Sequence, residues 1–204
     1  MYECDWEESM VLFDGLIRLL SWINEHLLKF GRGIGVVAIA IMVAVTLLQV
    51  FCRYVLGNAL PWPDEAARFC MLWMTGLMAP TAFRRGGFVA IDVLPSLLPG
   101  RVANLLNLLL LGISLVVLVI AVQIGWKEVT GLGGRFASAS LYLPTALDFS
   151  SWYRIPRSWM MMSIFVGVAL LVLVNIELIL RNFVRLVSDR PLPPIPLAET
   201  QGAE

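Results

Sequence analysis

Four long runs of apolar residues divide the chain, and each has the length of a helix that crosses a bilayer. They cover residues 33–56, 64–83, 102–124 and 158–180. A membrane-spanning helix needs about 20 predominantly apolar residues. Inside hydrocarbon the backbone must satisfy its own hydrogen bonds, so each run is expected to be helical. The pattern predicts an all-α integral membrane protein with four transmembrane helices and a membrane domain over residues 33–181.

Residues 1–32 show the pattern of an amphipathic helix instead. Apolar residues recur there at spacings of three and four, and polar residues follow the same spacing on another side of the helix. The apolar set is Leu12, Leu16, Leu19, Ile23, Leu27 and Phe30, and the polar set is Asp14, Arg18, Ser21, Glu25 and Lys29. Such a helix lies in the membrane interface with its apolar face toward lipid. We therefore expect an interfacial helix before the first span; packing on a soluble partner is the alternative.

The connections carry further expectations. Gly31 and Gly35 form a GxxxG pattern, which can mark a helix interface, but in this glycine-rich stretch we expect a flexible junction. The short loop at 57–62 makes the first two spans an antiparallel hairpin. The long connection at 125–157 carries aromatic residues, so we expect it to pack on the rest of the protein. The proline-rich residues 182–204 are expected to form a disordered tail.

Charge placement predicts the topology. An even number of spans puts both termini on one side, and basic residues favour the cytoplasmic side. Nine basic residues fall on the side of the termini: Arg18, Lys29, Arg32, Arg84, Arg85, Arg101, Arg181, Arg185 and Arg190. Five fall on the other side: Arg53, Lys127, Arg135, Arg154 and Arg157. We therefore expect both termini in the cytoplasm.

The densest group of ionisable residues near the membrane lies at the outer end of the first hairpin. Pro63 suits the first turn of a helix, and Asp64 and Glu65 complement the helix dipole there. Arg68 follows one turn after Asp64. We expect Arg53, at the end of the first span, to pair with Glu65 and fix the hairpin; an ion or substrate path is the alternative.

Other residues are expected to fix the helices or face protein. Trp62 belongs at headgroup depth, Pro80 follows Gly76 by four residues and predicts a bend, and Glu177 and Arg181 form an i,i+4 pair. The full set of structural and interface candidates is Arg53, Trp62, Asp64, Glu65, Arg68, Trp73, Arg84, Arg85, Asp92, Asn104 and Asn107. Asn104 and Asn107 share a face of the third span with Leu111, so this face is expected to meet protein.

Composition excludes several functions. The chain is 59% hydrophobic and 15% charged, against about 45–50% and 25% in soluble domains. Its one histidine excludes bis-histidine haem ligation within the chain, and its three cysteines form no CxxC. No nucleophile elbow, zinc-protease motif or phosphate-binding loop occurs. We therefore expect no catalytic site, no cofactor, no metal and no nucleic-acid partner.

Residues 53–94, RYVLGNALPWPDEAARFCMLWMTGLMAPTAFRRGGFVAIDVL, resemble the small membrane subunit of TRAP transporters, the DctQ-like family. The similar features are the Arg-Tyr that ends the first span, the Trp and acidic pair before Arg68, the aromatic second span, the Arg-Arg-Gly exit and Asp92. The segment SASLYL at 138–143, before a fourth helix that begins after Pro156, adds weaker support. The resemblance covers about residues 35–185.

This resemblance implies a tripartite, sodium-coupled transporter of organic acids in the bacterial inner membrane. Its other parts would be a large DctM-like transport subunit and a periplasmic DctP-like binding protein. The small subunit would brace the large one within the lipid and carry no transport site of its own. Two alternatives stay open: a small enzyme acting on lipid through Asp64, Glu65 and Arg68, and an autonomous homo-oligomeric carrier.

Overall fold

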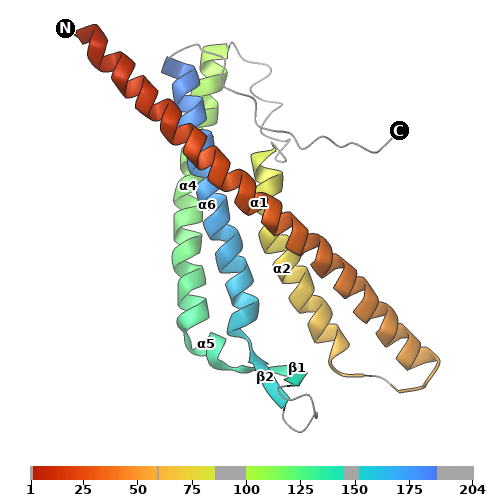
Figure 1. Ribbon diagram of the computed structural model, residues 1–204. Helices are drawn as coiled ribbons and strands as arrows, with labels where there is room; N and C mark the ends of the chain where they lie inside the picture. Colours follow the sequence, from red (N-terminus) through yellow and green to blue (C-terminus); the bar gives the residue numbers. More distant parts are fainter. Residues whose placement is uncertain (1, 59, 86–99, 145–151, 188–204) are drawn as a thin grey trace, which may run out of the picture.

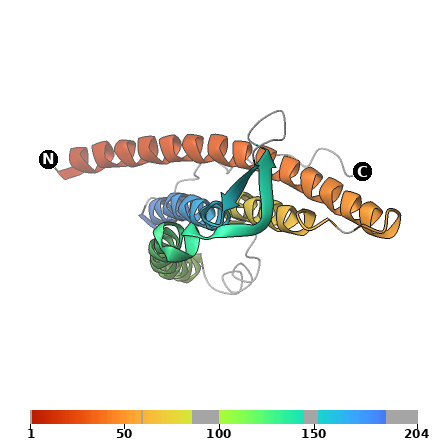
Figure 2. The same cartoon turned by 90° about the horizontal axis from the view of Figure 1, so that it is seen from below.

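The computed structural model describes residues 2–58, 60–85, 100–144 and 152–187, most of them helical (Figure 1). The helices are α1 (Tyr2–Tyr54), α2 (Pro63–Arg84), α4 (Gly100–Thr130), α5 (Leu132–Arg135) and α6 (Ser158–Val187). Two short strands are β1 (Ala137–Pro144) and β2 (Trp152–Pro156). Seen from below, α1 runs along one side of α2 and α6, and α4 lies on the opposite side of α6 (Figure 2).

The first helix runs unbroken for 53 residues through the glycines that were expected to form a flexible junction. That prediction is wrong, and the reason is packing against α2. A Cβ on Gly31 would lie 3.4 Å from the Leu77 carbonyl oxygen, and a Cβ on Gly35 would lie 2.8 Å from the Met78 methyl carbon. The GxxxG pattern therefore marks a helix contact, where small residues let two helices approach closely. The predicted interfacial helix and the predicted first span are therefore parts of one continuous helix, α1.

One narrow seam of α1 faces the other helices. Its buried residues are Ile17, Asn24, Leu28, Gly31, Gly35 and Ala38, and their spacing alternates between three and four with one gap. This is the heptad spacing of a helix that packs along a single line. The apolar stripe predicted for the interfacial helix, from Leu16 to Phe30, lies outside this seam, with its described members between 39% and 69% exposed. The stripe is thus free to face lipid while the seam packs.

The second helix lies between α1 and α6 and touches α6 where glycines meet. A Cβ on Gly76 would lie 2.5 Å from the Ser163 carbonyl oxygen, and one on Gly167 would lie 2.6 Å from the Gly76 carbonyl oxygen. Gly76 therefore lets the backbones of α2 and α6 approach each other. This role adds to the expected one, in which Gly76 lies one turn before the buried Pro80. Pro80 lies inside α2, which continues through it to Arg84.

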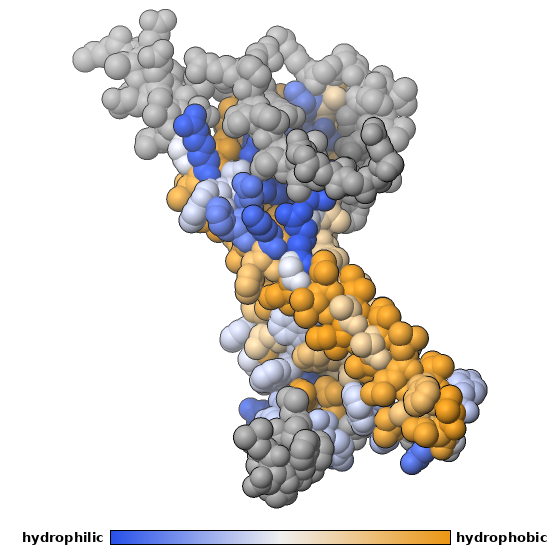
Figure 3. All heavy atoms as spheres, turned by 45° about the vertical axis from the view of Figure 1, so that its right-hand side comes forward, coloured by the Kyte–Doolittle hydropathy of each residue, from blue (hydrophilic) through white to orange (hydrophobic). Residues whose placement is uncertain are grey.

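Within the described residues, three helices are long and apolar enough to cross a membrane: Gly15–Tyr54, Val102–Thr130 and Ser158–Val184. The predicted second span corresponds to α2, which is not among the helices that meet this criterion of length and apolar character. It has a physical reason to be less hydrophobic, because α1 and α6 both pack against it and replace lipid contacts. In Figure 3 a hydrophobic surface covers the lower right of the molecule, where the C-terminal half of α1 runs.

The long connection predicted at 125–157 is partly regular structure. Helix α4 continues to Thr130, and β1 and β2 then form an antiparallel pair with an irregular register between Ala137 and Tyr142. These strands are a small departure from the expected all-α fold. Leu141 and Ile155 are buried, β1 contacts α2 and β2 contacts α6. The described part of this connection is therefore packed only in part, because Trp126, Phe136, Tyr142 and Tyr153 are between 42% and 66% exposed.

Replacing Gly76 by Ala should destabilise the protein, because the new methyl group would meet backbone of α6 that cannot rotate away. Overpacking of this kind costs about 1–3 kcal/mol. The matched control is Gly112→Ala on α4, where a Cβ has open space and alanine is the better helix former by up to about 1 kcal/mol. Thermal unfolding of the full-length protein in detergent measures both. Equal melting temperatures for the two variants would contradict the tight α2–α6 contact.

Candidate functional site

A buried cluster of charged residues joins three helices at the end of the molecule opposite the strand hairpin. Glu177 of α6 is completely buried, and Arg84 and Arg181 are 6% and 7% exposed. Glu177 lies about 29 Å along α6 from Ser158, at a rise of about 1.5 Å per residue. This distance is close to the thickness of a hydrocarbon core, about 30 Å.

Both oxygens of the Glu177 carboxylate accept hydrogen bonds from other helical positions. Oε1 accepts from Arg84 Nη2 at 2.8 Å and from Arg181 Nε at 3.0 Å. Oε2 accepts from Asn24 Nδ2 at 2.7 Å. Hydrogen bonds between ionised partners are short and about twice as strong as neutral ones. One carboxylate therefore connects α1, α2 and α6.

Ser21 of α1 completes the cluster from the other side. Its hydroxyl oxygen accepts from Arg84 Nη2 at 2.9 Å and from Arg181 Nη2 at 3.0 Å, and its carbonyl oxygen lies 3.3 Å from Arg84 Nη2. Asn24 Nδ2 also lies 3.4 Å from the Leu173 carbonyl oxygen. Asn24 belongs to the packed seam, and the half-buried Ser21 fills its gap between Ile17 and Asn24, so this side of α1 brings two polar groups to a point where α2 and α6 each present charge.

The chemistry of this cluster is that of a clasp between helices. A buried charge is tolerated when it is paired and its remaining hydrogen-bonding positions are filled. The Glu177 carboxylate meets these conditions with two guanidiniums and an amide. No group of three or more metal-ligating side chains occurs within the described ranges. The cluster has the composition to hold helices, since its carboxylate is already occupied by protein donors.

The sequence predicted the Glu177–Arg181 pair, and the 3.0 Å contact confirms it. It did not predict that Arg84 and Asn24 would reach the same carboxylate, because that depends on which helix faces meet. One signal was available. Glu177 is the only acidic residue between Ser158 and Val187, and an ionisable residue in an apolar span needs a partner.

The candidate residues at the other end of the first hairpin have fewer contacts with one another than the residues around Glu177. Arg53 is exposed, with its guanidinium carbon 6.0 Å from the centroid of the Tyr54 ring. Its pairing with Glu65, which is half-buried, stays a prediction. Asp64 and Arg68 are exposed, and Trp62 is half-buried.

The remaining candidates are divided. Trp73 is half-buried beside Phe69, with ring centroids 6.3 Å apart. Asn104 and Asn107 are half-buried on the face of α4 that includes Leu111. The Leu111 carbonyl oxygen accepts a hydrogen bond from Asn175 Nδ2 of α6 at 3.3 Å, in agreement with the expectation that this face meets protein. Arg85 is exposed, and Asp92 lies outside the described residues.

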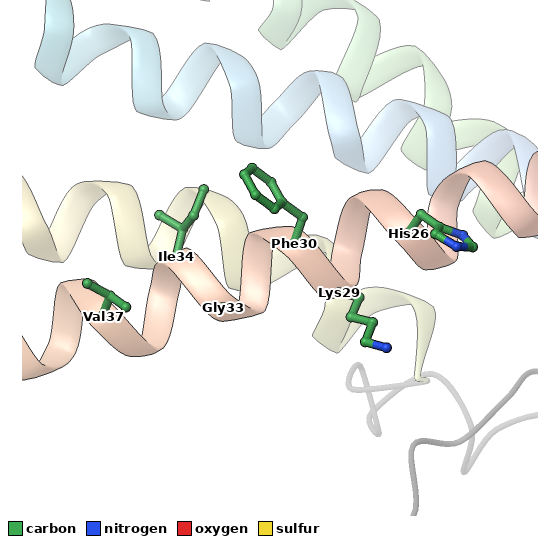
Figure 4. A pocket seen from close by; sticks show the side chains of 6 residues that line it. All are labelled: His26, Lys29, Phe30, Gly33, Ile34 and Val37. Atoms are coloured by element: carbon green, nitrogen blue, oxygen red, sulfur yellow. The ribbon is translucent and has the colours of Figure 1, made fainter.

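A hollow of about 540 Å³ on the outer side of α1 is not a comparable site. Its lining is His26, Lys29, Phe30, Gly33, Ile34 and Val37, all from one helix (Figure 4). The Lys29 and Phe30 side chains point in different directions, and His26 Nδ1 lies 3.0 Å from the Trp22 carbonyl oxygen. A binding pocket needs polar groups that converge, and the described lining has none.

Comparison with known proteins gives one family. The model described as "Tripartite ATP-independent periplasmic transporters, DctQ component" matches residues 42–185. No curated protein matches the chain. The matched region holds Arg84, Glu177 and Arg181, and it begins after Ser21 and Asn24.

Replacing Glu177 by Gln should strongly destabilise the protein, because two buried guanidiniums would lose their counter-charge. Removing one partner of a buried pair costs about 3–5 kcal/mol. Thermal unfolding of the full-length protein checks this, with Glu25→Gln as the control. Glu25 is exposed on α1, and such surface changes stay within about 0.5 kcal/mol.

A double-mutant cycle tests whether Arg84 and Glu177 act together. Arg84→Gln combined with Glu177→Gln should cost less than the sum of the two single changes, because neither charge is then left alone. The expected coupling is about 0.5–3 kcal/mol. Strict additivity would show that the two side chains do not interact.

Proposed function

The chain belongs to the DctQ family of TRAP transporter components, and from this premise we propose that it is the non-catalytic scaffold subunit of a sodium-coupled transporter for organic acids. The observation that carries the proposal is the family match over residues 42–185. A large DctM-like subunit would hold the substrate and ion sites, and a periplasmic DctP-like protein would deliver the substrate.

The use of charge inside the helices supports a scaffold role. Secondary transporters place their binding sites near the bilayer midplane, at helices that are interrupted. Here α1, α2, α4 and α6 are each continuous where they are described. The buried charges lie toward one end of the bundle and join helix to helix. A frame of this kind resists movement, as a support for a moving transport domain must.

We propose four spans, formed by the C-terminal half of α1 and by α2, α4 and α6. The N-terminal half of α1 would run along the cytoplasmic interface with its exposed apolar stripe in lipid, and both termini would be cytoplasmic. The charge cluster would then lie near the cytoplasmic boundary, with the strand hairpin outside. Residues 182–204 would extend into the cytoplasm, with α6 continuing to Val187 before the tail.

The exposed apolar sides of α1 and α4 are the surfaces available to the large subunit. None of the most apolar stretch of α4 is buried within this chain, and Leu105, Leu109 and Ile113 are all more than half exposed. Either lipid or another helical subunit must cover these side chains in a membrane. We propose that the large subunit covers one of the two sides and lipid the other.

Co-expression with the large multi-span protein from the same operon should yield a stable complex, whereas a membrane protein of unrelated family should not co-purify. In proteoliposomes, uptake of an organic acid should require this chain, the large subunit, the binding protein and a sodium gradient together. This chain alone should give no uptake above empty liposomes. Transport by the chain alone would identify an autonomous carrier and sink the scaffold proposal.

A further inference from the structure

A cavity of about 440 Å³ lies at the hairpin end of the molecule, where α2, the strands and α6 meet. This volume falls within the range of ligand pockets, about 300–1,000 Å³. Two arginines from distant parts of the chain line it: Arg68 of α2 and Arg157, which directly precedes α6. Unlike the hollow on α1, it is therefore walled by several elements and has polar groups on more than one side.

The lining changes from charged to apolar along the helices. Arg68 lies one turn before Leu72 on α2, and Arg157 directly precedes α6, which places Met160 and Met161 in its first turn. Both arginines are exposed, so their guanidiniums are open to a ligand. The cavity thus has two arginines at its charged end, and the apolar side chains follow them about one helical turn further along α2 and α6.

This change in polarity coincides with a membrane boundary. The apolar span of α6 begins at Ser158, next to Arg157. Trp62 precedes α2 at this end, and Trp159 is 52% exposed in the first turn of α6. Tryptophan is enriched at headgroup depth. The arginines therefore lie at the level of lipid headgroups, and Leu72 and Met161 lie toward the acyl chains.

We propose that this cavity binds one phospholipid, with its phosphate between Arg68 and Arg157 and an acyl chain against Leu72 and Met161. Guanidinium groups suit phosphate because their paired N–H donors match its oxygens. Methionine adapts to an irregular apolar partner. Glu65 lines the same rim, so the rim has two positive charges and one negative. That net charge suits the single negative charge of a phosphodiester better than a multiply charged anion.

An acidic protein loop would satisfy the arginines but would have no use for the apolar side chains one turn further in. The inference rests only on the membrane location of the chain and not on its partners.

Native mass spectrometry of the full-length protein, extracted in mild detergent, stripped of lipid and titrated with phosphatidylglycerol, tests it directly. We expect one tightly held lipid per chain, and about tenfold weaker binding in Arg68→Gln combined with Arg157→Gln.

The matched control is Arg53→Gln, which removes an exposed arginine at the same end of the membrane domain but outside the cavity. It should leave lipid binding unchanged. Inorganic phosphate, added in place of lipid, should neither bind measurably nor displace it, because it lacks the apolar part. Equal lipid binding in the double variant and the wild-type chain would overturn the proposal.

Two further outcomes would also overturn it. Tight binding of inorganic phosphate would identify a simple anion site. Unchanged lipid binding together with loss of a co-purifying protein in the double variant would identify a protein contact. Both variants replace exposed side chains, so melting temperature is expected to stay at the wild-type value and serves as the check on folding.

Discussion

The arrangement of the helices depends on the burial of one carboxylate. Glu177 has no contact with solvent, and its charge is tolerable only while donors from three helices surround it. Replacing such a network with apolar groups can leave stability unchanged, so its contribution is not necessarily net stability. Its contribution is specificity: a shift of α1 by one turn would remove the hydrogen bonds of Ser21 and Asn24 to the buried charges. We infer that this cluster sets the register of α1 against α2 and α6.

The close contact between α2 and α6 makes that cluster possible. Gly76 and Gly167 let the two backbones approach to a distance that any side chain would prevent. From there α2 continues two turns to Arg84, and α6 continues to Glu177, so the helices still lie within reach of a 2.8 Å ion pair. The glycine contact and the charge cluster are therefore successive points on one interface, the first setting the separation and the second the register.

The sequence predicted well what depends on local spacing. The lengths of the apolar runs predicted the helices, and the i,i+4 spacing predicted the Glu177–Arg181 pair. It could not predict which faces would meet, so the bond from Asn24 to Glu177 was missed. The continuity of α1 was missed because its glycines were interpreted through their flexibility, whereas Gly31 and Gly35 are packed against α2.

The two ends of α2 show how charge serves different purposes in one helix. At Arg84 the cation is buried, and its Nη2 bonds to Glu177 and Ser21, which ties that end of α2 to α6 and α1. At Arg68 the cation is exposed at the rim of a cavity, beside Arg157 and above apolar side chains. A charge that must hold helices together needs exclusion of water, whereas a charge that receives a ligand must stay accessible to it. The burial of each arginine therefore distinguishes an end of α2 that is fixed to its neighbouring helices from an end that stays open to its surroundings.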